Sequence, residues 1–502
     1  GGSEKRKTSP ATQIAALASN SELFHDSENK AYATITIGEH QETYALSSKG
    51  FSHWLSHEFY VAHRKAPTQQ ALKDALNVLQ GEAIHAGPLQ QVFVRLAGRD
   101  GRIYVDLGDA AWQAVEIDAS GWRLAPGHGV KFIRPKGLRE LPAPQPGGDL
   151  AVLRPFLNAA DDRQFALLLG FIVASLRPTG PYPILVLNGE QGAAKTTAAR
   201  VIKELVDPSK AAVRSAPREP RDLAIAAGNS WMLSYDNLSS LPPWLSDSLC
   251  QLSTGGGLAT RELYTNDEEM IFEATRPVVL NGISALATRG DLLDRAIVVV
   301  LPPIADGARR TEAEFWSDLR SWQPQMLGAL YDAVSCALAN VESTHLAEKP
   351  RMADMVTWIV AAEPCLPIAP GTFLAAYTEG RDTADATVLD ASPLAQALLK
   401  LVAAGEVTGT ASELLTRLAN VDLEASRSKS WPRDAARLGG QLRRLAPHLR
   451  RFGLEVEFVD SKGQRRAKRL IRILPVGLGA QSADDQSTES RSEPGAEDEK
   501  RF

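Results

Sequence analysis

The chain of 502 residues is 44% hydrophobic and carries a formal net charge of −5 at pH 7. This length exceeds one typical domain, and the hydrophobic fraction is sufficient for ordinary globular cores. No apolar run is long enough for a membrane-spanning helix, which needs about 18 residues, and three widely spaced cysteines exclude a disulfide framework and a metal site of known spacing. We therefore expect a cytoplasmic, multidomain protein.

The charge is distributed unevenly along the chain. Residues 427–472 contain fourteen Lys or Arg against four Asp or Glu, whereas the tail from Asp484 to Phe502 contains three against seven. This asymmetry, rather than the mean, indicates a nucleic-acid contact near the C-terminus.

Residues 1–30 are polar and begin with Gly1-Gly2-Ser3, a sequence typical of a tag remnant, so we predict a flexible N-terminus. Alternating apolar and polar residues from Ala31 predict a hairpin around Gly38–Glu42.

Two helices, over 50–65 and 66–84, and several short strands between 91 and 125 are expected next. The Pro/Gly-rich stretch 135–149 predicts a linker. We therefore expect an α+β domain over 31–149 that ends at this linker.

Residues 181–200 contain the spacing of a P-loop. The apolar run Pro183–Leu187 predicts a buried strand, and Gly189 is followed by four residues and then Ala194-Lys195-Thr196 at the start of a helix. Backbone N–H groups of such a loop surround a polyphosphate, and the helix N-terminus adds partial positive charge. The predicted ATP-binding residues are Gly189, Glu190, Gln191, Gly192, Ala193, Ala194, Lys195, Thr196 and Thr197.

Two of these residues have specific predicted roles. Lys195 would reach the β- and γ-phosphates, and the Thr196 hydroxyl would bind Mg²⁺. Ala194 stands where a glycine is usual, and alanine is tolerated there only if the position does not require a positive φ.

The apolar segment 231–235 predicts a second strand, which ends at Asp236. An acid at this point of a P-loop enzyme binds Mg²⁺ through water. Asn237 follows where a glutamate is expected, and its amide can orient water but cannot take its proton.

Two further apolar strands carry polar residues at their ends. One ends in Asn281, which could lie near the γ-phosphate or the attacking water, and the other begins directly after Arg295. Arg295 suits an arginine finger inserted into a neighbouring subunit's site, and Arg289 is the second candidate. Either arginine could instead form a surface salt bridge with Asp291 or Asp294.

The order of these segments resembles the superfamily-three helicases, in particular the primase-associated helicases of phages, plasmids and other mobile elements. The segments that carry the resemblance are GEQGAAKTT (189–197), LSYDN (233–237), STGGGLATRELYTNDEEMIF (253–272), VVLNG (278–282) and DRAIVVVLPP (294–303).

The resemblance implies an AAA+-like P-loop core over 150–345 and a hexameric ring that moves 3′→5′ on single-stranded DNA. It assigns the nucleotide and Mg²⁺ to Lys195 and Thr196, the metal-side acid to Asp236, the sensor to Asn281 and the trans-acting finger to Arg295. A primase or another replication protein is an expected partner.

Residues 253–272 resemble this superfamily's extra motif, a β-hairpin that points into the ring channel. The predicted tip, 265–269, is acidic and repels phosphate, so contact with DNA would have to use Arg261, Tyr264 or backbone N–H groups. The alternative is a ribbon that only packs subunits together.

The C-terminal third is predicted to contain a helical connection (346–391), a winged-helix domain (392–476) and a disordered acidic tail (477–502). A basic helix is expected to start at Ser430-Trp431-Pro432, with Pro447 kinking or ending it early, and a hairpin turn is expected at 460–463. A solvated charged face is the alternative, but the one-sided charge favours DNA. The predicted DNA-binding residues here are Arg437, Arg443, Arg444, Arg465, Arg466 and Lys468.

The sequence thus favours a ring-forming, ATP-driven DNA helicase or translocase. A loader that remodels protein–DNA complexes without unwinding is one rival. A second rival is a DNA-binding regulator that is switched by nucleotide. Asn237 leaves this rival open, because its amide cannot take a proton from the attacking water. We find no Asp-x-Asp strand of the kind a primase needs.

Overall fold

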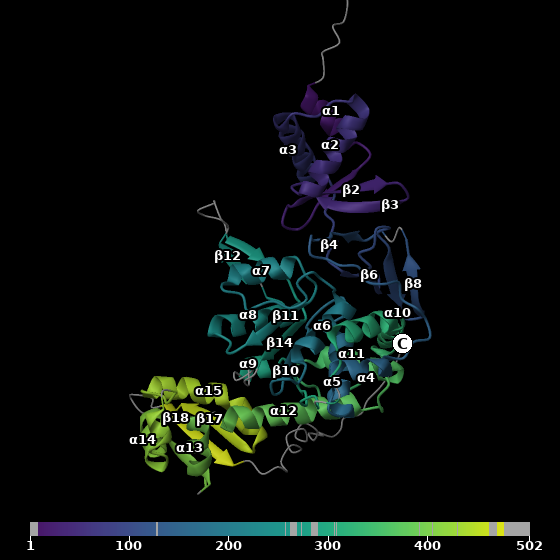
Figure 1. Cartoon of the computed structure of the whole chain (residues 1–502). Helices are drawn as coiled ribbons and strands as arrows, with labels where there is room; N and C mark the ends of the chain where they lie inside the picture. The colour runs from purple at the N-terminus through teal and green to yellow at the C-terminus, as the bar shows by residue number, and fades with distance from the viewer. Residues whose placement is uncertain are drawn as a thin grey trace, which may run out of the picture. The chain divides into compact units, whose positions relative to one another are not determined.

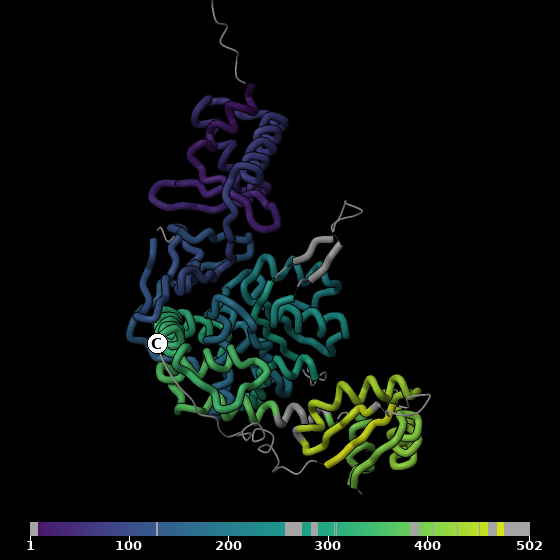
Figure 2. Tube along the Cα trace, turned by 180° about the vertical axis from the view of Figure 1, so that it is seen from behind, coloured from purple at the N-terminus to yellow at the C-terminus, as the bar shows by residue number. Residues whose placement is uncertain are grey.

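The computed structural model describes residues 9–126, 129–256, 258–261, 269–272, 274–282, 290–305, 307, 309–390, 392–403, 405–428, 430–460 and 469–475. The chain divides into two compact units, residues 1–381 and 382–502, and each is described by itself (Figure 1 and Figure 2).

The first part of unit one packs three helices against a three-stranded antiparallel sheet of order β1-β2-β3. Its elements are α1 (Pro10–Ala16), β1 (Glu22–His25), β2 (Ala31–Ile37), β3 (His40–Ala45), α2 (Lys49–His63) and α3 (Gln69–His85). The predicted hairpin is confirmed, since β2 pairs with β3. The prediction of a flexible segment is wrong for residues 9–30, because Ser9 caps α1 and Ile14 is fully buried against α2 and α3.

The second part is a four-stranded antiparallel sheet of order β5-β6-β7-β8, with a short parallel pair beside it. Its elements are β4 (Val92–Phe93), β5 (Leu96–Arg99), β6 (Arg102–Asp106), β7 (Ala114–Asp118), β8 (Gly121–Ala125) and β9 (Lys131–Phe132).

The predicted domain boundary at 135–149 is wrong. Leu141 is buried in the same hydrophobic core as β6 and the helices that follow, and its N–H bonds to the Leu107 carbonyl at 2.8 Å. Gln145 N–H likewise bonds to the Pro324 carbonyl at 2.8 Å. Prolines and glycines are typical of a linker, but here the segment obtains its hydrogen bonds from elements on both sides and joins them.

The third part of unit one surrounds a parallel sheet of order β11-β14-β10-β15. Its strands are β10 (Ile184–Asn188), β11 (Leu233–Leu238), β14 (Val278–Gly282) and β15 (Ala296–Val300), and an antiparallel pair joins β12 (Leu258–Arg261) to β13 (Glu269–Phe272). Its helices are η1 (Leu150–Leu153), α4 (Arg154–Leu157), α5 (Asp162–Ala174), α6 (Lys195–Val206), α7 (Pro220–Gly228), α8 (Pro243–Thr254), α9 (Gly290–Leu293), α10 (Glu312–Asn340), α11 (Ala353–Ala362), η3 (Glu363–Cys365) and the first part of α12 (Thr372–Asp390), which continues into unit two after Arg381.

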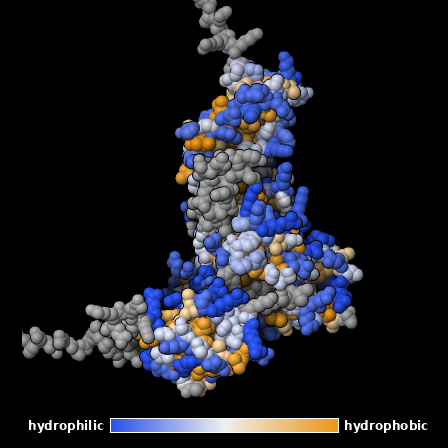
Figure 3. Space-filling model, turned by 90° about the vertical axis from the view of Figure 1, so that its left-hand side faces the viewer, coloured by the Kyte–Doolittle hydropathy of each residue, from blue (hydrophilic) through white to orange (hydrophobic). Residues whose placement is uncertain are grey.

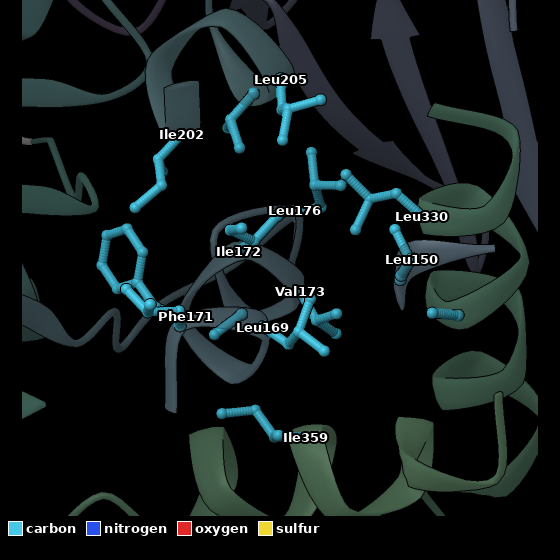
Figure 4. Packing of buried hydrophobic residues seen from close by; sticks show 14 of the residues in the cluster. Leu150, Leu169, Phe171, Ile172, Val173, Leu176, Ile202, Leu205, Leu330 and Ile359 are labelled. Atoms are coloured by element: carbon cyan, nitrogen blue, oxygen red, sulfur yellow. The ribbon is translucent and has the colours of Figure 1, made fainter. Parts of the chain in front are cut away.

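The apolar runs explain this arrangement. Residues 184–187 are all fully buried, as expected for a central parallel strand covered on both faces. Helix α5 is apolar all round from Phe165 to its end, and Figure 4 shows its side chains between those of α6, α10 and α11. Helix α11, predicted to be part of a connection, therefore belongs to this core.

Unit two has the chain order helix, strand, helix, helix, strand, strand, with an antiparallel sheet of order β16-β18-β17. Its elements are α13 (Pro393–Val402), β16 (Val407–Thr410), α14 (Ala411–Val421), η4 (Ala425–Arg427), α15 (Ala435–Arg451), β17 (Leu454–Asp460) and β18 (Arg469–Pro475).

The basic helix α15 begins later than predicted. Its N-cap is Asp434, whose carboxylate accepts a hydrogen bond from Arg437 N–H at 2.8 Å, and not Ser430. Pro447 does not end the helix, which continues for one more turn to Arg451. The predicted turn after Asp460 and the predicted disordered tail lie outside the described residues.

Among the described residues, no helix is both long and apolar enough to cross a membrane. Exposed large hydrophobic side chains are scattered over several elements, and the face in Figure 3 mixes small apolar groups with hydrophilic surface.

Candidate functional site

The turn between β10 and α6 has the backbone geometry of a phosphate-binding nest. Three of its residues, Gly189, Gly192 and Ala194, have positive φ angles of 148°, 87° and 57°. A β-carbon on Gly189 would lie 2.6 Å from the Leu301 carbonyl oxygen, so glycine is required there. Alternating backbone conformations of this kind turn successive N–H groups toward one concave surface.

Ala194 has a positive φ, the conformation in which alanine was expected to be unfavourable at this position. It is the N-cap of α6, with φ 57° and ψ 27°, and no side chain caps this helix end. A left-handed conformation costs an L-residue about 1–2 kcal/mol. The first N–H groups of α6, which lack a side-chain acceptor, are thus available to an anion.

Lys195, the first residue of α6, reaches back over the turn. Its Nζ donates to the carbonyl oxygens of Gly189 and Glu190, at 2.8 Å each. The ammonium group has no carboxylate partner within this hydrogen-bond set, so its positive charge remains available to a phosphate.

Thr196 and Asp236 lie forty residues apart in sequence, and the fold brings them together. The Thr196 hydroxyl, in the first turn of α6, donates to Asp236 Oδ1, in the second half of β11, at 3.0 Å. Mg²⁺ prefers oxygen ligands and is commonly held by one or two protein oxygens together with phosphates and water. A hydroxyl beside a carboxylate, next to a phosphate nest, fits that ion. The described residues contain no cluster of three or more His, Cys, Asp or Glu that could hold a metal.

Asn281 is the last residue but one of β14, the strand between β10 and β11. Its Oδ1 accepts a hydrogen bond from the backbone N–H of Asn237 at 2.9 Å. The side chain is 1% exposed, and among the described residues its buried Nδ2 has no hydrogen-bond partner. An unsatisfied buried amide is costly, so this N–H₂ is placed to donate to a group that joins the site.

Asn237 has φ 54°, a conformation that asparagine tolerates better than most residues. Its backbone N–H also bonds to Asp236 Oδ1, at 2.7 Å, and its side chain is exposed. The backbone of Asn237 therefore links the predicted metal-side acid to the predicted sensor.

Arg295 lies at the opposite end of the strands, directly before β15 begins. Its carbonyl accepts a hydrogen bond from Ile184 N–H at 2.9 Å, at the start of β10, whereas the phosphate nest follows the end of that strand. A strand of this length spans about 15 Å. Arg295 therefore cannot reach the β10–α6 turn of its own chain.

The alternative pairing predicted for Arg295, a salt bridge to Asp291 or Asp294, does not occur. Its Nη1 donates instead to the backbone carbonyl of Asp291 at 2.7 Å, and the Asp294 carboxylate pairs with Arg351 and Arg381. Arg289 lies outside the described residues.

Two residues near the nest were not predicted from the sequence. Asn158, which ends α4, donates from Nδ2 to the carbonyls of Ala193 at 3.1 Å and Pro302 at 2.8 Å, and so ties the nest to the chain after β15. Arg309 Nη2 lies 4.0 Å from the position of a β-carbon on Gly192. An asparagine after a short helix was a detectable signal for a left-handed cap, whereas no local pattern marked Arg309.

The predicted DNA-binding residues fall into two groups. Arg261 is paired with Glu269 in the β12–β13 hairpin, which confirms the strands, while Tyr264 and the acidic tip before Glu269 lie outside the described residues. Arg465, Arg466 and Lys468 are outside them as well.

The remaining three are exposed on α15. Arg437 lies 3.5 Å from the Asp434 carboxylate, the Arg443 guanidinium stacks 4.4 Å from the Phe458 ring centroid, and Arg444 Nε donates to the Gly440 carbonyl. The buried side chains of the same helix are three leucines, Leu438, Leu442 and Leu449, together with His448, so these three arginines lie on its outer side.

Two family models match the chain. Residues 150–385 match the "Actinomycete integrative conjugative element replication protein" model, and residues 394–487 match the "AICE RepA C-terminal domain" model. These matches relate both units to replication proteins of integrative conjugative elements. A search of the curated proteins found no match.

Two solved structures are similar at low identity. The apo NrS-1 C-terminal region is 12% identical, with 94% of this chain and 100% of that chain covered and a TM-score of 0.40. A JCV helicase bound to an acetamide compound is 14% identical, with 46% and 70% covered and a TM-score of 0.24. Both TM-scores are below the level that establishes a common fold.

Proposed function

We propose that this chain is an ATP-driven, ring-forming DNA helicase or translocase that acts in the replication of a mobile element. The observation that carries the proposal is the 3.0 Å contact between Thr196 and Asp236 beside a phosphate nest. The two residues have little reason to meet in a purely structural turn, but both are required where a Mg²⁺–nucleotide complex is bound.

In this proposal the first unit is an AAA+-like P-loop ATPase. The nest and the α6 N-terminus bind the phosphates, Lys195 exchanges its carbonyl partners for phosphate oxygens, and Thr196 and Asp236 hold Mg²⁺. The ion supplies charge neutralisation when it is bound. Asn281, through its free Nδ2, orients the attacking water or the γ-phosphate.

Completion of the site requires a second copy of the chain. Arg295 is on the far edge of the sheet from its own nest, so it can offset charge only at a neighbour's nucleotide. Repetition of this head-to-tail contact closes a ring, for which we propose a hexamer moving 3′→5′ on single-stranded DNA.

We propose that unit two is a winged-helix domain with α15 as the helix that contacts duplex DNA. Its order of elements and its exposed arginines support this. If about six phosphates are engaged, affinity falls by roughly 10³ between 50 and 200 mM salt.

The interface is tested with the double variant R443Q/R444Q. It should weaken duplex binding and flatten the salt dependence, whereas R417Q on α14, an equally exposed arginine of the same unit, should change neither. Equal effects of both variants would reject α15 as the contact.

The ATPase proposal is tested by measuring turnover with and without single-stranded DNA. We expect DNA to stimulate turnover, and R295A to lose turnover while keeping nucleotide affinity. A particle that remains monomeric and yet hydrolyses ATP at full rate at every concentration would refute a shared site.

The second candidate is a DNA-binding regulator or loader switched by nucleotide. The observation that favours it is Asn237, which stands at the position of the usual acid and cannot accept a proton. Under this candidate, nucleotide changes duplex affinity or assembly, and single-stranded DNA does not stimulate turnover.

A further inference from the structure

We infer that Asp294, held by Arg351 and Arg381, is the residue that positions Arg295 for the nucleotide of a neighbouring subunit. This inference rests on the proposed function and identifies positioning residues for that shared site.

Asp294 joins three elements that are distant in sequence. It lies between α9 and β15, and its Oδ2 is 2.5 Å from Nη1 of Arg351, which precedes α11. Its Oδ1 is 3.6 Å from Nη2 of Arg381, on α12. The Asp294 side chain is 17% exposed and that of Arg381 only 10%, so both charges are largely removed from water. An ion pair of this kind is sensitive to the loss of either partner.

The backbone around Asp294 is fixed as well. Asp294 N–H bonds to the Gly290 carbonyl at 2.9 Å, and Arg295 N–H bonds to the Leu292 carbonyl at 3.1 Å. The Arg295 side chain has one further tether, the 2.7 Å bond to the Asp291 carbonyl. Because Asp294 is the adjacent residue, its ion pairs fix the point from which Arg295 extends.

The cluster brings three guanidinium groups together, and the Asp294 carboxylate pairs with two of them, those of Arg351 and Arg381. The third, that of Arg295, bonds to the backbone carbonyl of Asp291. Among the described residues, the buried Nε atoms of Arg295 and Arg381 have no hydrogen-bond partner. A cluster built only for stability would satisfy these donors. The Arg295 guanidinium, which bonds to a backbone carbonyl and not to the Asp294 carboxylate, instead suits an anion brought by another molecule, such as the triphosphate of the next subunit.

The inference predicts a defect of a particular kind. D294N should lower the turnover number by roughly tenfold to a hundredfold, because small displacements of a catalytic group cost this much. Nucleotide affinity should remain unchanged, since the chain's own nest is intact. D291N is the matched control: it removes the same charge three residues away, keeps the backbone carbonyl that Arg295 uses, and should retain turnover.

A second pair of variants guards against loss of folding. Arg351 is 42% exposed, so R351Q should fold and show a milder version of the same defect. R351K keeps a cation at this position and should recover part of the turnover that R351Q loses.

Mixed oligomers provide the decisive readout. K195A subunits lack their own nucleotide site but donate an intact Arg295, whereas D294N subunits have an intact site and a misplaced Arg295. Co-assembly of the two inactive variants in equal amounts should restore about a quarter of wild-type turnover, because half of the sites are intact and half of those face an intact donor.

R295A mixed with K195A is the reference for this experiment. If that mixture recovers no turnover, the shared site itself is refuted. If it recovers turnover and the D294N mixture does not, or if D294N alone is as active as wild type, the role assigned to Asp294 is refuted.

Discussion

The two ends of helix α6 hold their lysines in opposite ways. Lys195, at the N-terminal end, is part-exposed and, among the described residues, bonds only to loop carbonyls. Lys203, near the C-terminal end, is 2% exposed and donates to Asp207 Oδ2 and to the Met232 carbonyl, at 2.6 Å each.

Asp207 completes the buried end. It also pairs with Arg95 Nε at 3.2 Å and accepts hydrogen bonds from the backbone N–H groups of Trp231 and Met232. Burial raises the pKa of Asp207, but Lys203 and Arg95 outweigh that effect and hold the pKa below its ordinary value. Burial lowers the pKa of Lys203, and its bond to Asp207 opposes this only in part.

The difference separates a lysine whose charge is paired with a buried carboxylate from one that bonds to backbone carbonyls. At the C-terminal end each charge has its partners inside the protein, and the pairing joins the β5–β8 part of the chain to the parallel-sheet core through Arg95. At the N-terminal end the Lys195 ammonium bonds to the carbonyls of Gly189 and Glu190, which a negatively charged ligand can replace. Substitution at the two ends should therefore affect different properties.

The largest effect on stability is expected at the buried end. K203M leaves Asp207 in the interior with one of its cations missing, and should lower the free energy of unfolding by about 3–5 kcal/mol. Urea unfolding monitored by circular dichroism measures this. A loss below about 1 kcal/mol would mean that the cluster is not structural.

The corresponding lysine-to-methionine substitution at the N-terminal end, K195M, should reduce catalysis. K195M should reduce ATP turnover by at least roughly 10²–10³, the usual cost of removing a group that stabilises transition-state charge. Its unfolding midpoint should stay at the wild-type value. Strong destabilisation by K195M would contradict the contrast between the two ends.

The stability that Asp207 contributes should depend on pH, because its pKa is lowered in the folded protein. A carboxyl group whose pKa is lowered on folding stabilises the protein above its unfolded pKa of about 3.9, and this contribution disappears as the pH falls through the lower folded pKa. The stability gap between wild type and D207N should thus be widest near neutral pH and narrow below about pH 4. A gap that is constant from pH 7 to pH 3 would contradict an ionised Asp207.

The smallest effect concerns the left-handed alanine of the nest. A194G removes the strain of a positive φ, worth about 1–2 kcal/mol, but adds freedom to the unfolded chain, so a net gain of about 0.5–1 kcal/mol is expected. A193G is the matched control: φ of Ala193 is not positive and its side chain is buried, so this change should destabilise. Equal effects of the two variants would show that Ala194 is not strained.

Much of the candidate site could be predicted from local patterns. The spacing of Gly189, Lys195 and Thr196 follows from the need to turn from a buried strand into a helix around phosphate. Asp236 and Asn281 could be added because the carboxyl ends of parallel strands meet at one edge of a sheet. The strands themselves were visible as short apolar runs.

The remaining features depend on contacts between distant residues. In the sequence nothing marks Arg95 as the partner of Asp207, 112 positions away. The stretch 135–149 has the composition of a linker, yet its hydrogen bonds come from both neighbouring parts.

What the sequence by itself determined is the set of groups that a nucleotide would need and the strand ends that carry them, because periodicity, turns and helix starts arise from neighbouring residues. Only the tertiary structure decided which charges are paired and which remain available, and that Arg295 lies at the opposite end of the strands from the β10–α6 turn. Burial and pairing are properties of the packed chain, so they become defined only when distant segments meet.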